Sequence, residues 1–306
     1  MSAIKITDLK KKYKDTKAVN GIDLKVRQGE VFGLLGPNGA GKTTTVEIIV
    51  GLSKADSGQV YVNGIDVAKY PRKVKSQIGV QLQNTALYPR LTVRELIELF
   101  RSFFPGEVRD TSDLIKIVNL QDKANTLSKN LSGGQRQRLS VALALVNKPK
   151  IVFLDEPTAG LDPRARRNMW DAIRSIQNEG VTVFLTTHYI EEAQSLCDRI
   201  AVMDFGKIIT LDSPENLIAT HYEEAAIGFD ILVGERNTNI FKSLPGVTRT
   251  ICDSNLVVLY TSDTTATMGK LIDLVDTGDI QLKDLSVRRA SLEDVFLKLT
   301  GRRIRE

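Results

Sequence analysis

The sequence predicts an α/β fold built on a mostly parallel β-sheet, with a small α+β domain after it. Three observations lead to this fold. A glycine-rich loop at residues 36–43 joins an apolar strand to a helix. Two continuous apolar runs, residues 150–156 and 181–188, lie on either side of a helical pattern, as do strands buried on both faces of a parallel sheet. Beyond residue 217 the pattern of strands and helices changes.

The first domain is expected to span residues 1–217. Short alternating runs between residues 4 and 35 predict strands, some of them antiparallel. Apolar spacing predicts a helix directly after the glycine-rich loop. Residues 84–150 are expected to form a helical subdomain, with helical spacing at 92–104 and 112–120.

The second domain is expected at residues 223–306. Its patterns read strand, helix, strand, strand, helix, strand, which matches a split βαβ sandwich of the ferredoxin-like kind. A final helix is predicted at residues 291–301. Nothing in this region singles out a functional residue.

Composition narrows the class of protein. Of 306 residues, 42% are hydrophobic and 26% are charged, as in an ordinary globular protein. The net charge of +5 comes from interspersed acids and bases, so we expect no nucleic acid ligand. Cys197 and Cys252 lie far apart, which argues for a reducing compartment. No apolar run approaches the roughly 18 residues that span a bilayer, so we expect a cytosolic chain.

The glycine-rich loop fits the phosphate-loop pattern G-x-x-x-x-G-K-[ST] in full. Its residues, with the threonine that follows, are Gly36, Pro37, Asn38, Gly39, Ala40, Gly41, Lys42, Thr43 and Thr44. The backbone N–H groups of such a loop and the helix N-terminus attract phosphate oxygens. Lys42 is expected to reach the β- and γ-phosphates and Thr43 to ligate Mg²⁺. The guanine-reading pattern N-K-x-D is absent, which favours ATP.

Two acids, Asp155 and Glu156, stand at the carboxyl end of a buried apolar run. Open α/β sheets bind ligands at that end of their strands. We expect Asp155 to organise Mg²⁺ and Glu156 to act as general base toward the water that attacks the γ-phosphate. Taken alone, this pair also has a purely structural interpretation, as two acids at the start of a helix.

Three further side chains are candidates by their place along the chain. His188 ends the next apolar run and should reach the γ-phosphate, although a capping histidine is the commoner case. Gln83 ends another strand, where its amide can touch both Mg²⁺ and the attacking water. Tyr13 lies between the first two strands and can stack on a nucleobase, although an exposed hairpin tyrosine is weak evidence by itself. His221 receives no role.

A second phosphate-binding pattern begins at Ser132. Ser132 and Gln135 have the form of a capping box. Gly133 and Gly134 each weaken a first turn by roughly 1 kcal/mol relative to alanine, unless something must approach the backbone closely. Because residues 36–43 already surround a nucleotide, we predict that this helix caps the ATP held by a second copy of the chain.

The motifs "GPNGAGKTT", "LSGGQ", "LDEPTAGLD" and "TTH", in this order and spacing, resemble the nucleotide-binding subunit of ATP-binding-cassette (ABC) transporters over residues 4–217. The resemblance implies a P-loop NTPase fold with an antiparallel β subdomain and a helical subdomain. It also implies roles for six residues: adenine stacking for Tyr13, the Q-loop glutamine for Gln83, contacts to the partner's γ-phosphate for Ser132 and Gly134, the D-loop acid for Asp162 and the switch histidine for His188.

A narrower resemblance concerns the branch of the family. The segment before "LSGGQ" lacks the T-x-G-E-x-G run of many fused exporters, and "RRASLEDVFLKLTGR" is similar to the end of ABC-2 type exporter ATPases of the daunorubicin-resistance-like branch. This implies an ATPase on the cytoplasmic face of the membrane, driving a separate permease that exports a hydrophobic or amphiphilic compound. We expect the permease to dock at residues 84–104, although ordinary core packing explains the leucines there equally well.

Alternatives remain at the level of sequence. No motif position is degenerate, which favours a homodimer, and a heterodimer with a second ATPase stays open. An importer ATPase fits the C-terminal resemblance less well. A soluble ABC protein acting on nucleic acid or ribosomes is disfavoured, because such proteins carry two cassettes in one chain or a long coiled coil, and this chain has neither.

Overall fold

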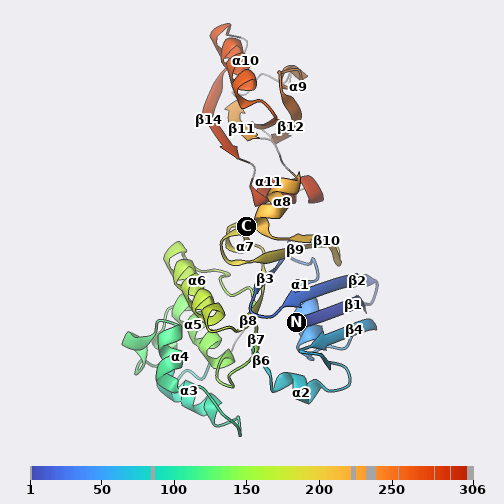
Figure 1. Cartoon of the computed structure of the whole chain (residues 1–306). Coiled ribbons are helices and arrows are strands. Elements are labelled where there is room, and N and C mark those ends of the chain that lie inside the picture. The colour runs from blue at the N-terminus through green and yellow to red at the C-terminus, as the bar shows by residue number, and fades with distance from the viewer. Residues whose placement is uncertain are drawn as a thin grey trace. The chain divides into compact units, whose positions relative to one another are not determined.

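The computed structural model describes residues 2–83, 87–221, 225–231, 239–253, 255–278, 280–289 and 291–301. The chain divides into two units, Met1–Pro214 and Glu215–Arg303, and each is described below by itself (Figure 1). The first unit carries every residue that the sequence proposes for nucleotide binding.

The first unit opens with an antiparallel sheet in the strand order β2-β1-β4-β5. Its strands are β1 (Ser2–Tyr13), β2 (Thr16–Arg27), β4 (Ser57–Val62) and β5 (Ile65–Asp66). A tight hairpin joins β1 to β2, with Tyr13 opposite Thr16. Helix α1 (Lys42–Ile49) contacts β2, β4 and a strand of the second sheet, so it lies between the two sheets.

The second sheet has the strand order β10-β9-β3-β8-β7-β6. Its strands are β3 (Val31–Leu35), β6 (Ile78–Gln81), β7 (Ile151–Asp155), β8 (Thr182–Thr187), β9 (Arg199–Asp204) and β10 (Lys207–Asp212). All neighbours are parallel except the β9–β10 pair. Every residue of β3, β7 and β8 is buried, which explains their continuous apolar runs.

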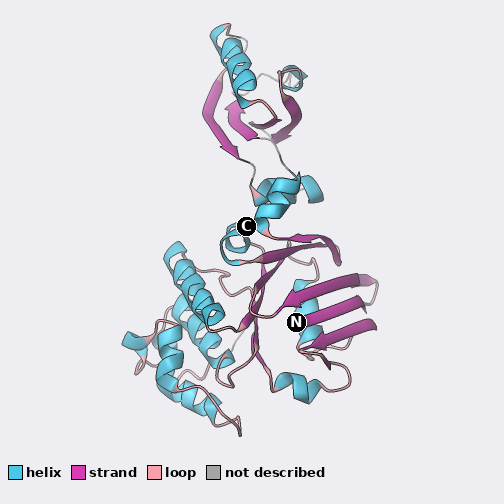
Figure 2. Cartoon of the chain, viewed as in Figure 1, coloured by secondary structure: helices cyan, strands magenta, loops and turns pink. Residues whose placement is uncertain are grey.

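A helical group, visible beside the parallel sheet in Figure 2, follows β6 in the chain. It contains α3 (Val93–Arg101), α4 (Thr111–Ile117), α5 (Gly133–Ala144) and two 3₁₀ turns, η1 (Gln121–Lys123) and η2 (Ser128–Asn130). The predicted helix at 112–120 is shorter in the structure, because Asn119 takes a left-handed conformation (φ 52°). Outside this group lie α2 (Pro71–Lys75), α6 (Pro163–Asn178) and α7 (Ile190–Leu196).

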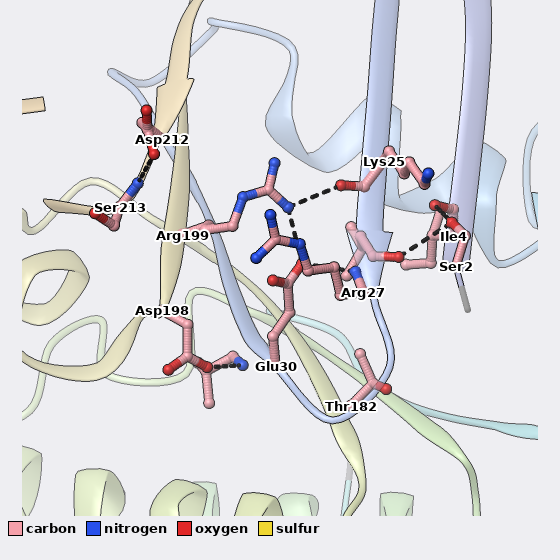
Figure 3. A network of polar contacts seen from close by, with 12 residues as sticks. Ser2, Ile4, Lys25, Arg27, Glu30, Thr182, Asp198, Arg199, Asp212 and Ser213 are labelled. Carbon is pink, nitrogen blue, oxygen red and sulfur yellow. Dashed lines mark hydrogen bonds and ion pairs between the residues drawn. The ribbon is translucent and has the colours of Figure 1, made fainter. Parts of the chain in front are cut away.

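A polar network ties the amino-terminal edge of the parallel sheet to β2 (Figure 3). Arg199 Nη1 donates to Lys25 O at 3.1 Å and lies 3.2 Å from Glu30 Oε1. Asp198 Oδ2 accepts the Val31 backbone N–H at 2.7 Å. The bond from Arg199 to Lys25 joins the two sheets at the edge opposite the glycine-rich loop, whereas the bond from Val31 to Asp198 lies within the parallel sheet.

The second unit contains a four-stranded sheet in the order β12-β13-β11-β14, with antiparallel neighbours throughout. In chain order its elements are β11 (Ala225–Ile231), α9 (Asn239–Lys242), β12 (Val247–Asp253), β13 (Leu256–Thr261), α10 (Thr264–Asp276), β14 (Leu282–Arg289) and α11 (Leu292–Thr300). A split βαβ arrangement produces this strand order. Residues 223 and 306, the predicted ends of this domain, lie outside the described residues.

Two polar contacts attach helices to this second unit. Tyr260 is fully buried and its hydroxyl donates to Asp294 Oδ1 at 2.8 Å, which joins β13 to α11. Lys298 Nζ donates to His221 O at 2.6 Å, which joins α11 to the end of α8 (Pro214–His221). Most of α8 therefore belongs to the second unit, whereas the sequence placed residues up to 217 in the first.

Gly79 tests the packing of the helical group on the sheet. A Cβ at Gly79 would lie 1.8 Å from Ala144 O of α5, and backbone cannot yield as a side chain can. We expect Gly79→Ala to lower the free energy of unfolding by about 1–3 kcal/mol, measured by thermal and urea denaturation. Gly106→Ala is the matched control, because nothing lies within 4 Å of its added Cβ. Equal stability of the two variants would contradict this packing.

Candidate functional site

The glycine-rich loop leaves β3 and ends where α1 begins. Its first N–H, at Gly36, donates to Thr187 O of β8 at 3.2 Å. A Cβ at Gly36 would lie 2.2 Å from Met203 O, and one at Gly41, whose φ is 105°, would lie 2.1 Å from Ala18 O. Glycine is therefore required at both positions by the close approach of neighbouring backbone.

Lys42 lies inside this loop. Its side chain is 4% exposed, and Nζ donates to Gly36 O at 2.8 Å and Pro37 O at 3.1 Å. Nζ also lies 3.3 Å from Glu156 Oε1. Burial lowers the pKa of Lys42, and the carboxylates of Glu156 and Asp155 oppose that shift. The loop thus holds a buried cation beside inward-facing backbone, an arrangement that attracts a polyphosphate.

Asp155 and Glu156 end β7 and are both buried. Thr186 of the neighbouring strand donates to Asp155 Oδ1 at 2.5 Å, and its Oγ1 accepts the Glu156 N–H at 3.0 Å. Thr43 Oγ1 lies 3.5 Å from Asp155 Oδ1. Glu156 itself has φ 49°, a left-handed conformation that is uncommon for a non-glycine residue.

Three side chains converge on the Glu156 carboxylate. His188 Nδ1 lies 3.3 Å from Oε2, Gln83 Nε2 donates to Oε2 at 3.4 Å, and Lys42 faces Oε1. The pKa of Glu156 is lowered, chiefly by the contact with His188 and also by the charge of Lys42, against the opposing effect of burial. An ionised carboxylate therefore stands at the centre of this group at neutral pH.

The parallel register explains why these residues meet. Leu35 pairs with Thr187, and Asp155 pairs with Thr186, so the segments that follow β3, β8 and β7 leave the sheet at one edge. Gln83 follows β6, the next strand in the same sheet. The structure thus gathers Lys42, Gln83, Asp155, Glu156 and His188, which lie far apart in the sequence.

Tyr13 lies at the end of β1 with 46% of its surface exposed. Lys11 Nζ lies 5.2 Å from the centroid of its ring, and its hydroxyl is 3.4 Å from Ser53 Oγ. An exposed ring at a hairpin end is accessible to a planar ligand, and the contacts with Lys11 and Ser53 define its position.

A second group of predicted residues lies at the start of α5. Ser132 and Gln135 form the predicted capping box, with Ser132 N–H donating to Gln135 Oε1 at 2.9 Å and Gln135 N–H to Ser132 Oγ at 3.3 Å. They line a shallow hollow of about 290 Å³, together with Gly134, Arg138, Asp162, Arg164, Ala165 and Asn168. In the described part of the chain no hydrogen bond or ion pair joins this hollow to the Glu156 group.

The two glycines of this helix differ, which corrects the sequence argument. A Cβ at Gly134 would lie 2.8 Å from the Cβ of Ala165 on α6, so internal packing already requires glycine there. A Cβ at Gly133 would have nothing within 4 Å. Gly133 therefore has open space at its Cβ position, whereas Gly134, which lines the hollow, is packed against α6.

Asp162, which lines the same hollow, also has a structural role within its own helix. It is the N-cap of α6, and its carboxylate accepts the N–H groups of Arg164 at 3.0 Å and Ala165 at 2.9 Å. Its place beside Ser132 and Gly134 was not evident from spacing alone, because α5 and α6 meet only in the folded chain.

Sequence reasoning missed two polar residues near Glu156. Thr186 forms hydrogen bonds with both Asp155 and Glu156. Its only sign in the sequence is a hydroxyl side chain two residues before His188. Glu192 is fully buried on α7, and an acid in a helical pattern gives no sign of burial. Among the described residues no cluster of three or more histidine, cysteine or acidic side chains could hold a metal ion by itself.

A phosphate loop and paired acids at one edge of a parallel sheet define a nucleotide-hydrolysing P-loop protein. The chain matches the family model described as ABC transporter over residues 19–159. It is 38% identical to a daunorubicin resistance ATP-binding protein, DrrA3, of Streptomyces coeruleorubidus, over 100% of this chain and 98% of that protein. It is 37% identical to the Nod factor export ATP-binding protein I of Rhizobium etli, over 99% of this chain and 94% of that protein.

Solved structures agree with this assignment. An ATP-binding cassette solved as a dimer in a post-hydrolysis state, bound to ADP and Pi, superposes with a TM-score of 0.62 and 29% identity, covering 69% of this chain and 98% of that one. The cbiO1 subunit from Clostridium perfringens, part of an ABC transporter complex, gives 0.65 and 28%, covering 72% and 92%. The chain belongs to the ABC transporter family as an ATP-binding protein, and it is an ATPase.

The two glycines of α5 give a direct test of the hollow. We expect Gly134→Ala to lower the free energy of unfolding by about 1–3 kcal/mol, because its Cβ meets Ala165. Gly133→Ala should leave stability equal or raise it by up to about 1 kcal/mol, because alanine favours helix. Thermal denaturation measures both. Destabilisation by Gly133→Ala alone would show that the packing described here is wrong.

Proposed function

We propose that this chain is the ATP-hydrolysing subunit of an ABC exporter, which drives a separate transmembrane permease that exports a hydrophobic or amphiphilic compound. The observation that carries this proposal is the whole-chain likeness to export proteins, including the second unit, at 37–38% identity. The relatives' names refer to daunorubicin resistance and to Nod factor export.

Glu156 is the proposed general base. Its carboxylate is ionised, accepts a hydrogen bond from Gln83 and lies 3.3 Å from His188 Nδ1, so it can accept the proton of a water directed at the γ-phosphate. His188 orients the carboxylate through its Nδ1 contact. Lys42, fixed inside the loop, would balance the charge of the β- and γ-phosphates.

Mg²⁺ fits the oxygen atoms beside the loop. Thr43 Oγ1 and Asp155 Oδ1 lie 3.5 Å apart, and hydroxyl and carboxylate oxygens are the donors that Mg²⁺ prefers. We assign Thr43 and Asp155 as its holders, with the Gln83 amide as a further oxygen donor. When bound, the ion neutralises charge on the phosphate oxygens.

A second copy of the chain is the proposed partner across the hollow. Ser132, Gly133, Gly134 and Gln135 at the start of α5, with Asp162 beside them, would contact the ATP held by the other copy. The positive end of α5 favours a phosphate there, and nothing lies within 4 Å of the Cβ position of Gly133. A related cassette has been solved as a dimer bound to ADP and Pi, which supports this assembly.

The permease is proposed to dock on residues 87–104 at the cytoplasmic face of the membrane. Asn84, where the expected surface began, lies outside the described residues. Leu96 and Ile97 are buried in the helical group, but Tyr88 is 57% exposed and Phe103 is 60% exposed. Among the described residues no helix has the length and apolar character needed to cross a bilayer.

The role of Glu156 predicts a specific variant. Glu156→Gln should keep ATP affinity, lower turnover at least about 100-fold and accumulate an ATP-bound dimer, because the amide cannot accept the proton. Phosphate release and size-exclusion chromatography measure these effects. Glu107→Gln, at an 89% exposed acid, is the control and should match the parent protein.

The dimer has its own test in the same background. Adding Ser132→Arg to Glu156→Gln should abolish the ATP-bound dimer while the monomer still binds ATP, because the arginine fills the hollow. Ser112→Arg, at an exposed serine of α4, is the matched control. A dimer that persisted with Ser132→Arg would contradict the proposed interface, and near-normal turnover of Glu156→Gln would contradict the base.

The transport function is tested by isolating the chain from native membranes in mild detergent. We expect a polytopic membrane protein to copurify, and Tyr88→Arg with Phe103→Arg to reduce its recovery severalfold. Ile209→Arg, which alters an exposed apolar residue of β10, should not reduce it. Recovery of ribosomes in place of a membrane protein would contradict the exporter assignment.

A further inference from the structure

Glu192 is a fully buried acid on the helix that follows His188. It lies in the first turn of α7, four residues after His188. Its exposed fraction is 0%, and the indole Nε1 of Trp170 on α6 donates to its Oε1 at 3.3 Å. Burying a carboxyl group without a full set of hydrogen-bond partners raises the free energy of the folded chain. We therefore expect a buried acid such as Glu192 to have a specific role.

Burial favours the neutral form of the Glu192 carboxyl. Burial raises its pKa, and the Thr187 and Thr158 hydroxyls, the Trp170 indole and the Arg166 charge oppose that shift more weakly. Among the described residues, Glu192 Oε2 and Thr158 Oγ1 are buried without a hydrogen-bond partner. A carboxylic acid can donate as well as accept a hydrogen bond, so its proton suits a site that holds a neighbouring hydroxyl oxygen.

The neighbours of this carboxyl come from three functional segments. Thr187 precedes His188, and its Oγ1 accepts the Tyr189 N–H at 2.9 Å, which fixes the turn that carries the histidine. Thr158 follows Glu156 by two residues. Trp170 stands on α6, the helix that Asp162 caps at the hollow. The Glu192 carboxyl therefore accepts a hydrogen bond from the helix of the second phosphate site, and it lies near hydroxyls of the histidine turn and of the segment after Glu156.

A second contact between the same elements supports this arrangement. Arg166 of α6 places its Cζ 4.4 Å from the centroid of the Tyr189 ring, and that ring packs against His188 with centroids 4.1 Å apart. The two contacts are one helical turn apart on α6, at Arg166 and Trp170. Helix α6 is thus attached to the histidine turn at two successive levels.

We propose that Glu192 is a positioning residue for ATP hydrolysis, whose carboxyl holds the turn of His188, the segment after Glu156 and helix α6 in one arrangement. The proposal rests on the roles proposed above for Glu156 and His188. A buried polar group whose neighbours come from several segments favours one packing, because displacing any of them changes its polar surroundings. Glu192 acts through these neighbours and is not assigned contact with ATP.

The test compares three variants in ATP turnover and in equilibrium binding of a fluorescent ATP analogue. Glu192→Ala should lower kcat about tenfold or more, because small displacements of catalytic groups are costly. Its affinity for the analogue should stay within about threefold, since Lys42 and the loop are not its neighbours. Glu192→Gln keeps the shape and the donor capacity and should restore at least half of kcat. Glu191→Gln, at a 73% exposed acid on the same turn, is the matched control.

Three results would overturn the proposal: an unchanged kcat for Glu192→Ala, a Glu192→Gln variant as slow as Glu192→Ala, or affinity lost in step with kcat. Should Glu192→Ala not fold, Trp170→Phe removes the indole donor, along with some ring volume, and must lower kcat at constant affinity. An unchanged kcat for that variant would equally overturn it. Failure of the proposed exporter function would look different from failure of the Glu192 proposal. In the first case the parent protein itself would not couple ATP turnover to a membrane partner.

Discussion

The buried pair of Lys42 and Glu156 is the contact around which the first unit is organised. Each side chain alone would be costly to bury, because desolvation penalises an unpaired charge. Together, 3.3 Å apart and supported by the carbonyls of Gly36 and Pro37, they are tolerated. As a result, the phosphate loop already holds a cation and the sheet edge already carries an ionised base before a nucleotide binds.

That pair can exist only because of the parallel sheet. Parallel strands end at one edge, so the residues that follow β3, β7 and β8 become neighbours whatever their separation in sequence. The polar network of Arg199, Glu30 and Asp198 secures the opposite edge. Thr186 then bonds both acids across adjacent strands, and this contact sets the direction of Asp155 and the left-handed backbone of Glu156.

The two glycines at the start of α5 serve two different purposes. Gly134 is needed for the close packing of α5 on α6, while Gly133 has open space at its Cβ position at the same helix end. Asp162 caps α6 beside that opening. Adjacent residues therefore serve packing inside one chain and contact with a second chain. Helix α6 connects the hollow to the turn of His188 through Trp170 and Arg166.

The sequence by itself determined the class of fold, the phosphate loop and the order of the motifs, because strand burial, helix capping and phosphate loops leave local signatures. It also indicated Gln83, Glu156 and His188 through their places after apolar strands. The tertiary structure alone decided that Gly134 serves packing, that Thr186 bonds both acids and that Glu192 is buried. Those facts depend on which distant segments touch, and local sequence patterns carry no record of contacts between distant segments.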